Sequence, residues 1–148
     1  MASKSEEELR KISIELRYFE QTAEALQSRI NMMNAVLADL TYASMALEGL
    51  EKETEDLKLL VPIGGTSYIK AKLADPDKLI VGIGAGVSVE RTREEAKETI
   101  KRRLEDLEKA KMSTQQQFAQ VAEKINEHRK KLDELVAAIR EGKAQENV

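Results

Sequence analysis

The stretch that decides the fold is KLIVGIGAGVSVE, residues 78–90. An apolar run fills 79–83, as in a buried strand, and Val87 and Val89 then alternate with polar residues, as in a second strand. Between them, residues 84–86 (Gly-Ala-Gly) predict a tight turn with positive φ angles, and Gly82 allows a bend or a close backbone approach. The stretch is therefore predicted to be a β-hairpin.

A second hairpin is predicted directly upstream. Residues 61–73 read VPIGGTSYIKAKL, with apolar residues on both sides of a Gly-Gly pair. The Asp-Pro-Asp sequence at 75–77 then predicts a turn, because proline presets the φ angle of its first central residue. Residues 59–91 are thus expected to form four short strands in two hairpins.

The glycines do not match a nucleotide-binding loop. The dinucleotide fingerprint needs Gly-x-Gly-x-x-Gly at the start of a helix, whereas Gly82, Gly84 and Gly86 are evenly spaced and a strand pattern follows them. The sequence also lacks the Gly-Lys-Ser/Thr of a phosphate loop. No cofactor is expected.

A long helix is predicted upstream, over residues 5–58. Its apolar residues recur in alternating steps of three and four, which is the heptad seam of a coiled coil. The seam positions are Leu9, Ile12, Leu16, Phe19, Ala23, Leu26, Ile30, Met33, Leu37 and Leu40, continued after one shortened step by Ala43, Leu47, Leu50 and Leu57. Pro62 forbids further helix, so the end is expected near Lys58.

The downstream part, over residues 92–141, repeats this design. Its seam positions are Ile100, Leu104, Leu107, Lys111, Thr114, Phe118, Val121, Ile125, His128, Leu132, Leu135 and Ile139. Thr92 and Glu95 match a capping box at its start, and Gly142 predicts its stop, leaving 142–148 as a tail. Because the helices have nearly equal lengths, an antiparallel hairpin within one chain is favoured over two coiled coils with separate partners. The whole chain, 1–148, is expected to be one domain.

Composition excludes several classes of function. The chain has no cysteine, one histidine, 3% aromatic residues and a net charge of −3, so thiolate chemistry, a metal centre and a basic nucleic-acid footprint are all disfavoured. A single histidine on a seam is expected to be a packing residue. No arrangement of residues suggests an enzyme. The polar, acidic start and the absence of a long apolar run predict a cytoplasmic protein without signal peptide or membrane span.

The predicted hairpins need partners. Two isolated hairpins on a thin coiled coil leave apolar residues and strand edges uncovered. Pooling strands from several chains into a β-barrel would cover both, so the β region is predicted to be the oligomer interface. Its residues are Val61, Ile63, Ile69, Leu73, Leu79, Val81, Ile83, Val87 and Val89.

The opposite end of the helical hairpin, where both chain termini lie, is predicted to bind other proteins. Ile14 and Tyr18 are apolar, lie off the seam and share one helix face, and clustered exposed apolar residues favour an interaction site. Neighbouring seam residues would become available if the helix ends separate. The predicted tip residues are Leu9, Ile12, Ile14, Leu16, Tyr18, Phe19, Leu135, Val136 and Ile139.

The pattern of a helix, the stretch LVPIGGTSYIKAKLADPDKLIVGIGAGVSVE at 60–90, and a second helix resembles the alpha class of the prefoldin family. The two hairpins carry the likeness, since beta-class members have one. The resemblance implies an assembly of two alpha-class and four beta-class subunits joined through a double β-barrel. It also implies an ATP-independent chaperone that passes non-native polypeptides from its arm tips to a group II chaperonin.

Two alternatives stay open from the sequence. One is a prefoldin-like subunit that assembles by itself into filaments or another oligomer. The other is a structural coiled-coil scaffold without chaperone activity.

Overall fold

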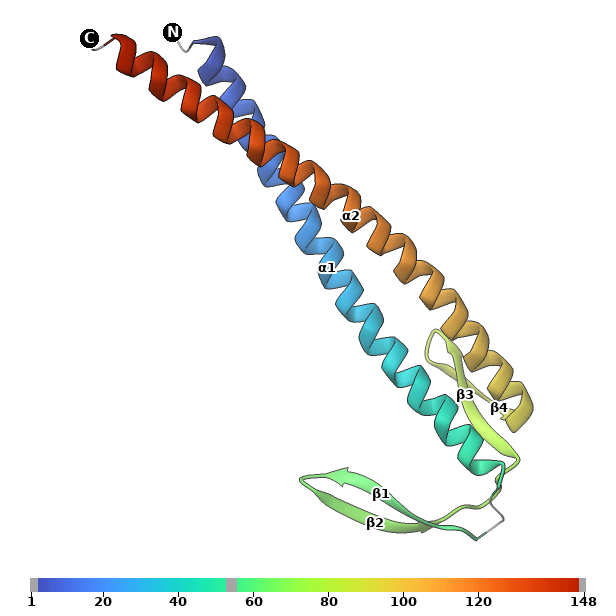
Figure 1. Ribbon diagram of the computed structural model, residues 1–148. Coiled ribbons are helices and arrows are strands. Elements are labelled where there is room, and N and C mark those ends of the chain that lie inside the picture. The colour runs from blue at the N-terminus through green and yellow to red at the C-terminus, as the bar shows by residue number, and fades with distance from the viewer. Residues whose placement is uncertain (1–2, 53–55, 147–148) are drawn as a thin grey trace. The chain divides into compact units, whose positions relative to one another are not determined.

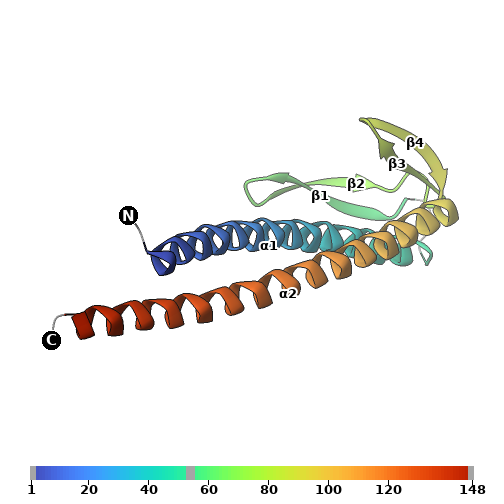
Figure 2. The ribbon, with the colours of Figure 1, turned by 90° about the horizontal axis from the view of Figure 1, so that it is seen from above.

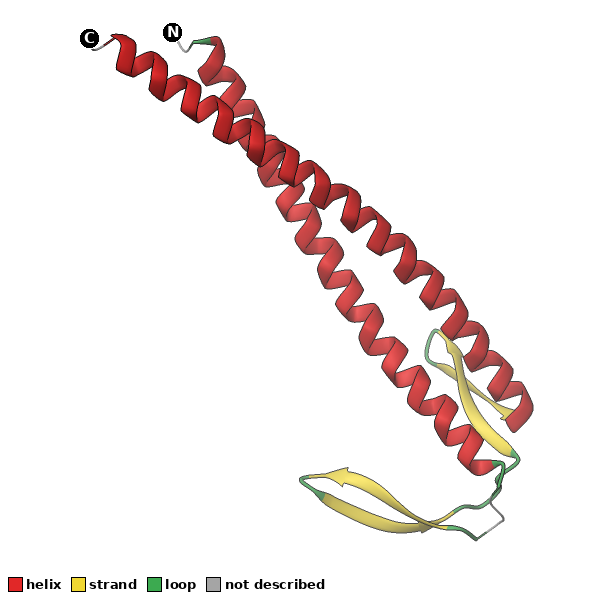
Figure 3. Cartoon of the chain, in the orientation of Figure 1, coloured by secondary structure: helices red, strands yellow, loops and turns green. Residues whose placement is uncertain are grey.

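The computed structural model describes residues 3–52 and 56–146. Figures 1 and 3 show the element order, a long helix, two hairpins and a second long helix. The elements are α1 (Lys4–Leu50), β1 (Lys58–Gly64), β2 (Ser67–Lys72), β3 (Lys78–Gly84), β4 (Val87–Thr92) and α2 (Arg93–Glu146). The predicted fold class, mainly helical with two small hairpins between the helices, is confirmed. Barrel assembly stays a prediction.

Both helices end at places that differ from the prediction. α1 ends at Leu50 rather than near Lys58, because the chain turns off to pair with the first hairpin: the Leu73 amide donates to the Leu57 carbonyl oxygen at 2.8 Å. Leu57 is therefore not a helical seam residue. α2 runs past Gly142 to Glu146, since one glycine costs a helix only about 1 kcal/mol and does not force a stop.

The start of α2 has the predicted capping box. The Glu95 amide donates to Thr92 Oγ1 at 3.2 Å, and the Thr92 amide donates to Glu95 Oε2 at 3.2 Å. These bonds satisfy donors that the first helical turn leaves without partners. At the start of α1 the cap is Ser3, whose Oγ accepts from the Glu6 amide at 3.3 Å.

The chain divides into two compact units, each built from both helices. The described residues of the first unit are 3–34 and 109–146, and the second unit is 35–108. Every predicted seam position that lies in the helices is buried or half-buried. The most buried of them are Ile12, Ile30, Thr114 and Ile125 in the first unit and Leu47 in the second. Ala96, which is 1% exposed, lies one step before the predicted seam and was missed. The heptad pattern therefore predicted the packed faces correctly.

Each hairpin is a separate antiparallel pair with a tight turn, as Figure 2 shows from above. β1 pairs with β2 and β3 with β4, and both ladders shift register just before the turn, between Pro62 and Gly64 and between Gly82 and Gly84. The second turn has φ angles of +117°, +51° and +75° at residues 84–86. The positive φ angles predicted for this turn are confirmed, and its central residue is an alanine.

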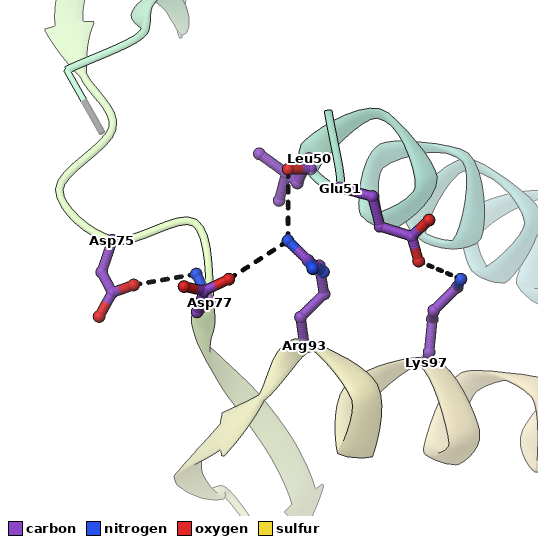
Figure 4. Close-up of polar contacts among 6 residues, drawn as sticks. All are labelled: Leu50, Glu51, Asp75, Asp77, Arg93 and Lys97. Carbon is purple, nitrogen blue, oxygen red and sulfur yellow. Dashed lines mark hydrogen bonds and ion pairs between the residues drawn. The ribbon is translucent and has the colours of Figure 1, made fainter. Parts of the chain in front are cut away.

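Arg93 joins three elements of the second unit (Figure 4). Its Nη1 donates to the Leu50 carbonyl oxygen at 3.4 Å and lies 3.4 Å from Asp77 Oδ1, while its amide donates to the Asp77 carbonyl oxygen at 2.8 Å. The side chain is 19% exposed. One turn further, Lys97 pairs with Glu51. These contacts tie the end of α1 to the start of α2 and to the turn that precedes β3.

No helix in residues 3–52 and 56–146 is long and apolar enough to cross a membrane.

Candidate functional site

Each hairpin has one apolar face, set by its register. Residues directly opposite in an antiparallel pair point to the same side, and successive residues alternate sides. In β1–β2 the pairs Leu59–Ala71 and Val61–Ile69 share a face. In β3–β4 the pair Val81–Val89 follows Leu79–Arg91 on one face. The apolar face of each hairpin is therefore suited to packing against the apolar surface of another molecule.

The residues predicted for the oligomer interface divide into two groups. Exposed residues are Val61 (44%), Ile63 (59%), Ile69 (54%), Ile83 (53%) and Val87 (51%). Half-buried residues are Leu73, Leu79, Val81 and Val89. Leu73 lies just beyond β2, and its amide donates to the Leu57 carbonyl oxygen. The assignment of these residues to an interface stays a prediction, and their exposure within a single chain leaves them available for one.

The sequence prediction missed further exposed apolar residues of the hairpins. They are Leu59, Leu60, Tyr68 and Ile80. Leu59 was detectable, because it alternates in step with Val61. Leu60, Tyr68 and Ile80 lie on the opposite faces, so alternation with the apolar face gave no reason to choose them.

The predicted tip residues lie in the first unit, near the ends of both helices. Ile14 and Tyr18 are 65% and 64% exposed. The remaining residues take part in the packing between α1 and α2 and are half-buried, apart from Ile12, which is only 7% exposed. Ile12 and Leu135 also line a shallow hollow with Glu8, Lys131 and Glu134. The tip thus has one exposed apolar pair beside a covered seam.

A polar and aromatic cluster in the seam includes Tyr18, Phe19 and His128. His128 Nε2 lies 2.9 Å from Glu15 Oε2, and its Nδ1 lies 2.8 Å from the Lys124 carbonyl oxygen. The Phe19 ring packs edge-to-face against the His128 imidazole, with ring centroids 5.1 Å apart. It packs in the same way against the Tyr18 ring, with centroids 5.7 Å apart. The His128 side chain is 15% exposed. His128 therefore packs in the seam, as expected, and no metal-binding cluster occurs among the residues that the structure describes.

Other exposed apolar residues of the helices were also missed. They are Met32, Val36, Tyr42, Met45 and Met112. The only signal for them was an apolar side chain at a position outside the heptad seam, the same signal that selected Ile14 and Tyr18.

The Glu51–Lys97 pair changes the titration of both groups. The hydrogen bond from Lys97, more than its charge alone, lowers the pKa of Glu51, and the same bond raises the pKa of Lys97. Each side chain is 35% exposed. The pair supports the junction between the helices, and its location gives no sign of acid–base chemistry.

Comparisons with known proteins agree with this architecture. The family model described as "Prefoldin subunit" matches residues 19–138. The prefoldin subunit alpha of Methanococcoides burtonii is 36% identical over 74% of this chain and 79% of its own. That of Pyrococcus horikoshii is 31% identical over 90% of each chain. A chain of filamentous prefoldin from Methanocaldococcus jannaschii, solved by cryo-electron microscopy, superimposes with a TM-score of 0.66 at 27% identity, covering 76% of this chain and 93% of that one.

The helix–hairpin–hairpin–helix order, the match over most of the chain and the similarity to alpha subunits lead to one conclusion: this chain belongs to the prefoldin family.

Proposed function

We propose that this chain is a subunit of an ATP-independent molecular chaperone that binds non-native polypeptides through its tip and delivers them to a group II chaperonin. Membership of the prefoldin family supports a chaperone-type function. The observation that carries the finer proposal is the exposure of Ile14 and Tyr18, at 65% and 64%, in the unit that contains both chain ends.

The exposed pair suits a non-native polypeptide for a physical reason. Ile14 and Tyr18 are four residues apart on α1, so they form one small apolar surface on one side of the helix. Unfolded chains expose apolar segments, and burying these against the pair removes apolar area from water on both sides. Leu9, Leu16 and Leu135 are half-buried nearby and would enlarge the surface if the helix ends separated.

Assembly is proposed to run through the hairpins, with beta-class subunits as partners, two alpha with four beta. Prefoldin subunits form oligomers with one another, and the apolar hairpin faces of this chain are suited to that role. Val61 and Ile69, for example, are opposite each other and both about half exposed. Sharing these faces in a barrel would cover the apolar area and close the strand edges. We expect the assembly to work in the cytoplasm.

The test is a tip variant in the assembled protein. Ile14→Ser with Tyr18→Ser should abolish most of the suppression of aggregation of a chemically denatured model protein, while the mass of the oligomer is unchanged. A matched control is Tyr42→Ser with Met45→Ser, since these side chains are 69% and 61% exposed on the same helix. Equal suppression by the tip variant and the control would refute the tip as the client site. Transfer is tested separately, by refolding of a captured client after a group II chaperonin and ATP are added.

Self-assembly is the second candidate. The similarity to a prefoldin described as filamentous favours it. A hetero-oligomer and a filament are distinguished by the mass of the assembly that this chain forms alone and after mixing with a beta-class subunit. A discrete complex of both chains supports the proposed function. Species of increasing mass that contain this chain alone support a filament. If either assembly forms without suppressing aggregation, the chain is a structural scaffold.

A further inference from the structure

The first hairpin has a second face, which the proposed client binding at the tip and the proposed assembly through the apolar faces do not use. Opposite residues of β1 and β2 place Lys58 with Lys72, Leu60 with Lys70 and Pro62 with Tyr68 on the side away from Val61 and Ile69. We call the residues Lys58, Leu60, Tyr68, Lys70 and Lys72 the lysine face. All five are exposed, Leu60 at 65% and Tyr68 at 59%.

The lysine face has uncompensated positive charge. β1 and β2 contain no acidic residue. None of the ion pairs found among residues 3–52 and 56–146 includes Lys58, Lys70 or Lys72. Lys58 and Lys72 are directly opposite each other, and like charges in this position destabilise a sheet. A bound anionic group would relieve that repulsion.

The spacing of the charges matches an extended acidic peptide. Lys70 and Lys72 are two residues apart on one strand, or roughly 6.6 Å, which is also the distance between alternate side chains of any extended chain. The three lysines and Leu60 line one hollow of the hairpin, which also includes Leu59 and Ala71 of the apolar face. Exposed Leu60 and Tyr68 lie beside the charges and offer apolar contact. We propose that the lysine face binds an extended acidic segment of a partner protein.

A polypeptide fits this face better than a nucleic acid does. The lysine face is only a few residues long, whereas nucleic-acid sites usually extend as a basic stripe. The mixture of lysines with a leucine and a tyrosine is suited to a peptide that carries both acidic and apolar side chains. This inference does not rest on client binding at the tip.

The test measures binding of a fluorescein-labelled peptide of alternating Glu and Thr to the assembled protein, by fluorescence anisotropy. The wild-type protein should bind it, and more weakly as salt rises. Replacing Lys58, Lys70 and Lys72 by Gln should weaken binding about tenfold, as expected for three exposed ion pairs. The same replacement at Lys109, Lys130 and Lys143, exposed lysines of α2, changes the net charge equally. It should leave binding within about twofold, because these lysines lie outside the hairpin.

Three results would overturn the proposal. Equal weakening in both triple variants would show a general charge effect. Tighter binding of single-stranded DNA, lost in the same variant, would make the face a nucleic-acid site. A change in the mass of the oligomer on replacing Lys58, Lys70 and Lys72 would show that the face is covered by assembly. Suppression of aggregation should be unaffected in this variant, which separates the inference from the proposed function.

Discussion

Leu47 provides the sharpest test of the helix packing. Its side chain is 4% exposed in the second unit, and it belongs to the part of the seam that follows the shortened step. Met45, two residues earlier on the same helix, is 61% exposed. The two substitutions Leu47→Ala and Met45→Ala therefore shorten an apolar side chain on opposite sides of one helix, with similar effects on helix propensity.

The expected difference follows from burial. Truncating a buried leucine to alanine lowers the free energy of unfolding by roughly 2–5 kcal/mol, through lost transfer free energy and the cavity left behind. A seam between two helices has solvent on both sides and can partly close, so we expect about 2–3 kcal/mol for Leu47→Ala. Met45→Ala should change the free energy of unfolding by less than about 0.5 kcal/mol.

The assay is urea unfolding followed by helical circular dichroism. The free energy comes from the midpoint and the slope, and an unchanged slope shows that the same surface unfolds. Protein concentration is held constant, because assembly raises apparent stability by mass action. If Leu47→Ala destabilises no more than Met45→Ala, the seam does not continue through Leu47 and the packing described for the second unit is wrong.

Three smaller predictions concern single features. Thr114 is 5% exposed and its hydroxyl donates to the Ala110 carbonyl oxygen of its own helix, so Thr114→Val should raise the urea midpoint slightly; a fall would show that the hydroxyl stabilises the seam. In the second turn, Gly84→Ala at φ +117° should destabilise the protein by about 1–3 kcal/mol, whereas Ala85→Gly at φ +51° should lower its thermal midpoint little or raise it; the reverse order would contradict the turn geometry. Lys97 lowers the pKa of Glu51, so the stabilising effect of the pair is present above the ordinary pKa of 4.5 and is lost as the pH falls through the lower, folded value. Urea midpoints at neutral and acid pH should therefore differ less in Glu51→Gln than in the wild-type protein, and an equal difference would contradict the pairing.

The sequence by itself determined which helix faces are packed. A spacing of three and four places one side of a helix against its partner whatever the residue there, so even Thr114 and His128 could be assigned to the seam from their positions. It also determined both hairpins, because the turn at residues 84–86 needs backbone conformations that glycine adopts at low cost.

Only the tertiary structure decided the features that depend on pairing between distant residues. α1 ends at Leu50 because Leu57 pairs with Leu73, a contact that no local pattern of the helix contains. The lysine face exists because the register of the first hairpin places Lys58 opposite Lys72. A shift of one residue would send these side chains to the other side of the strand pair, so charge and apolar area are sorted by the pairing of the strands and not by their composition.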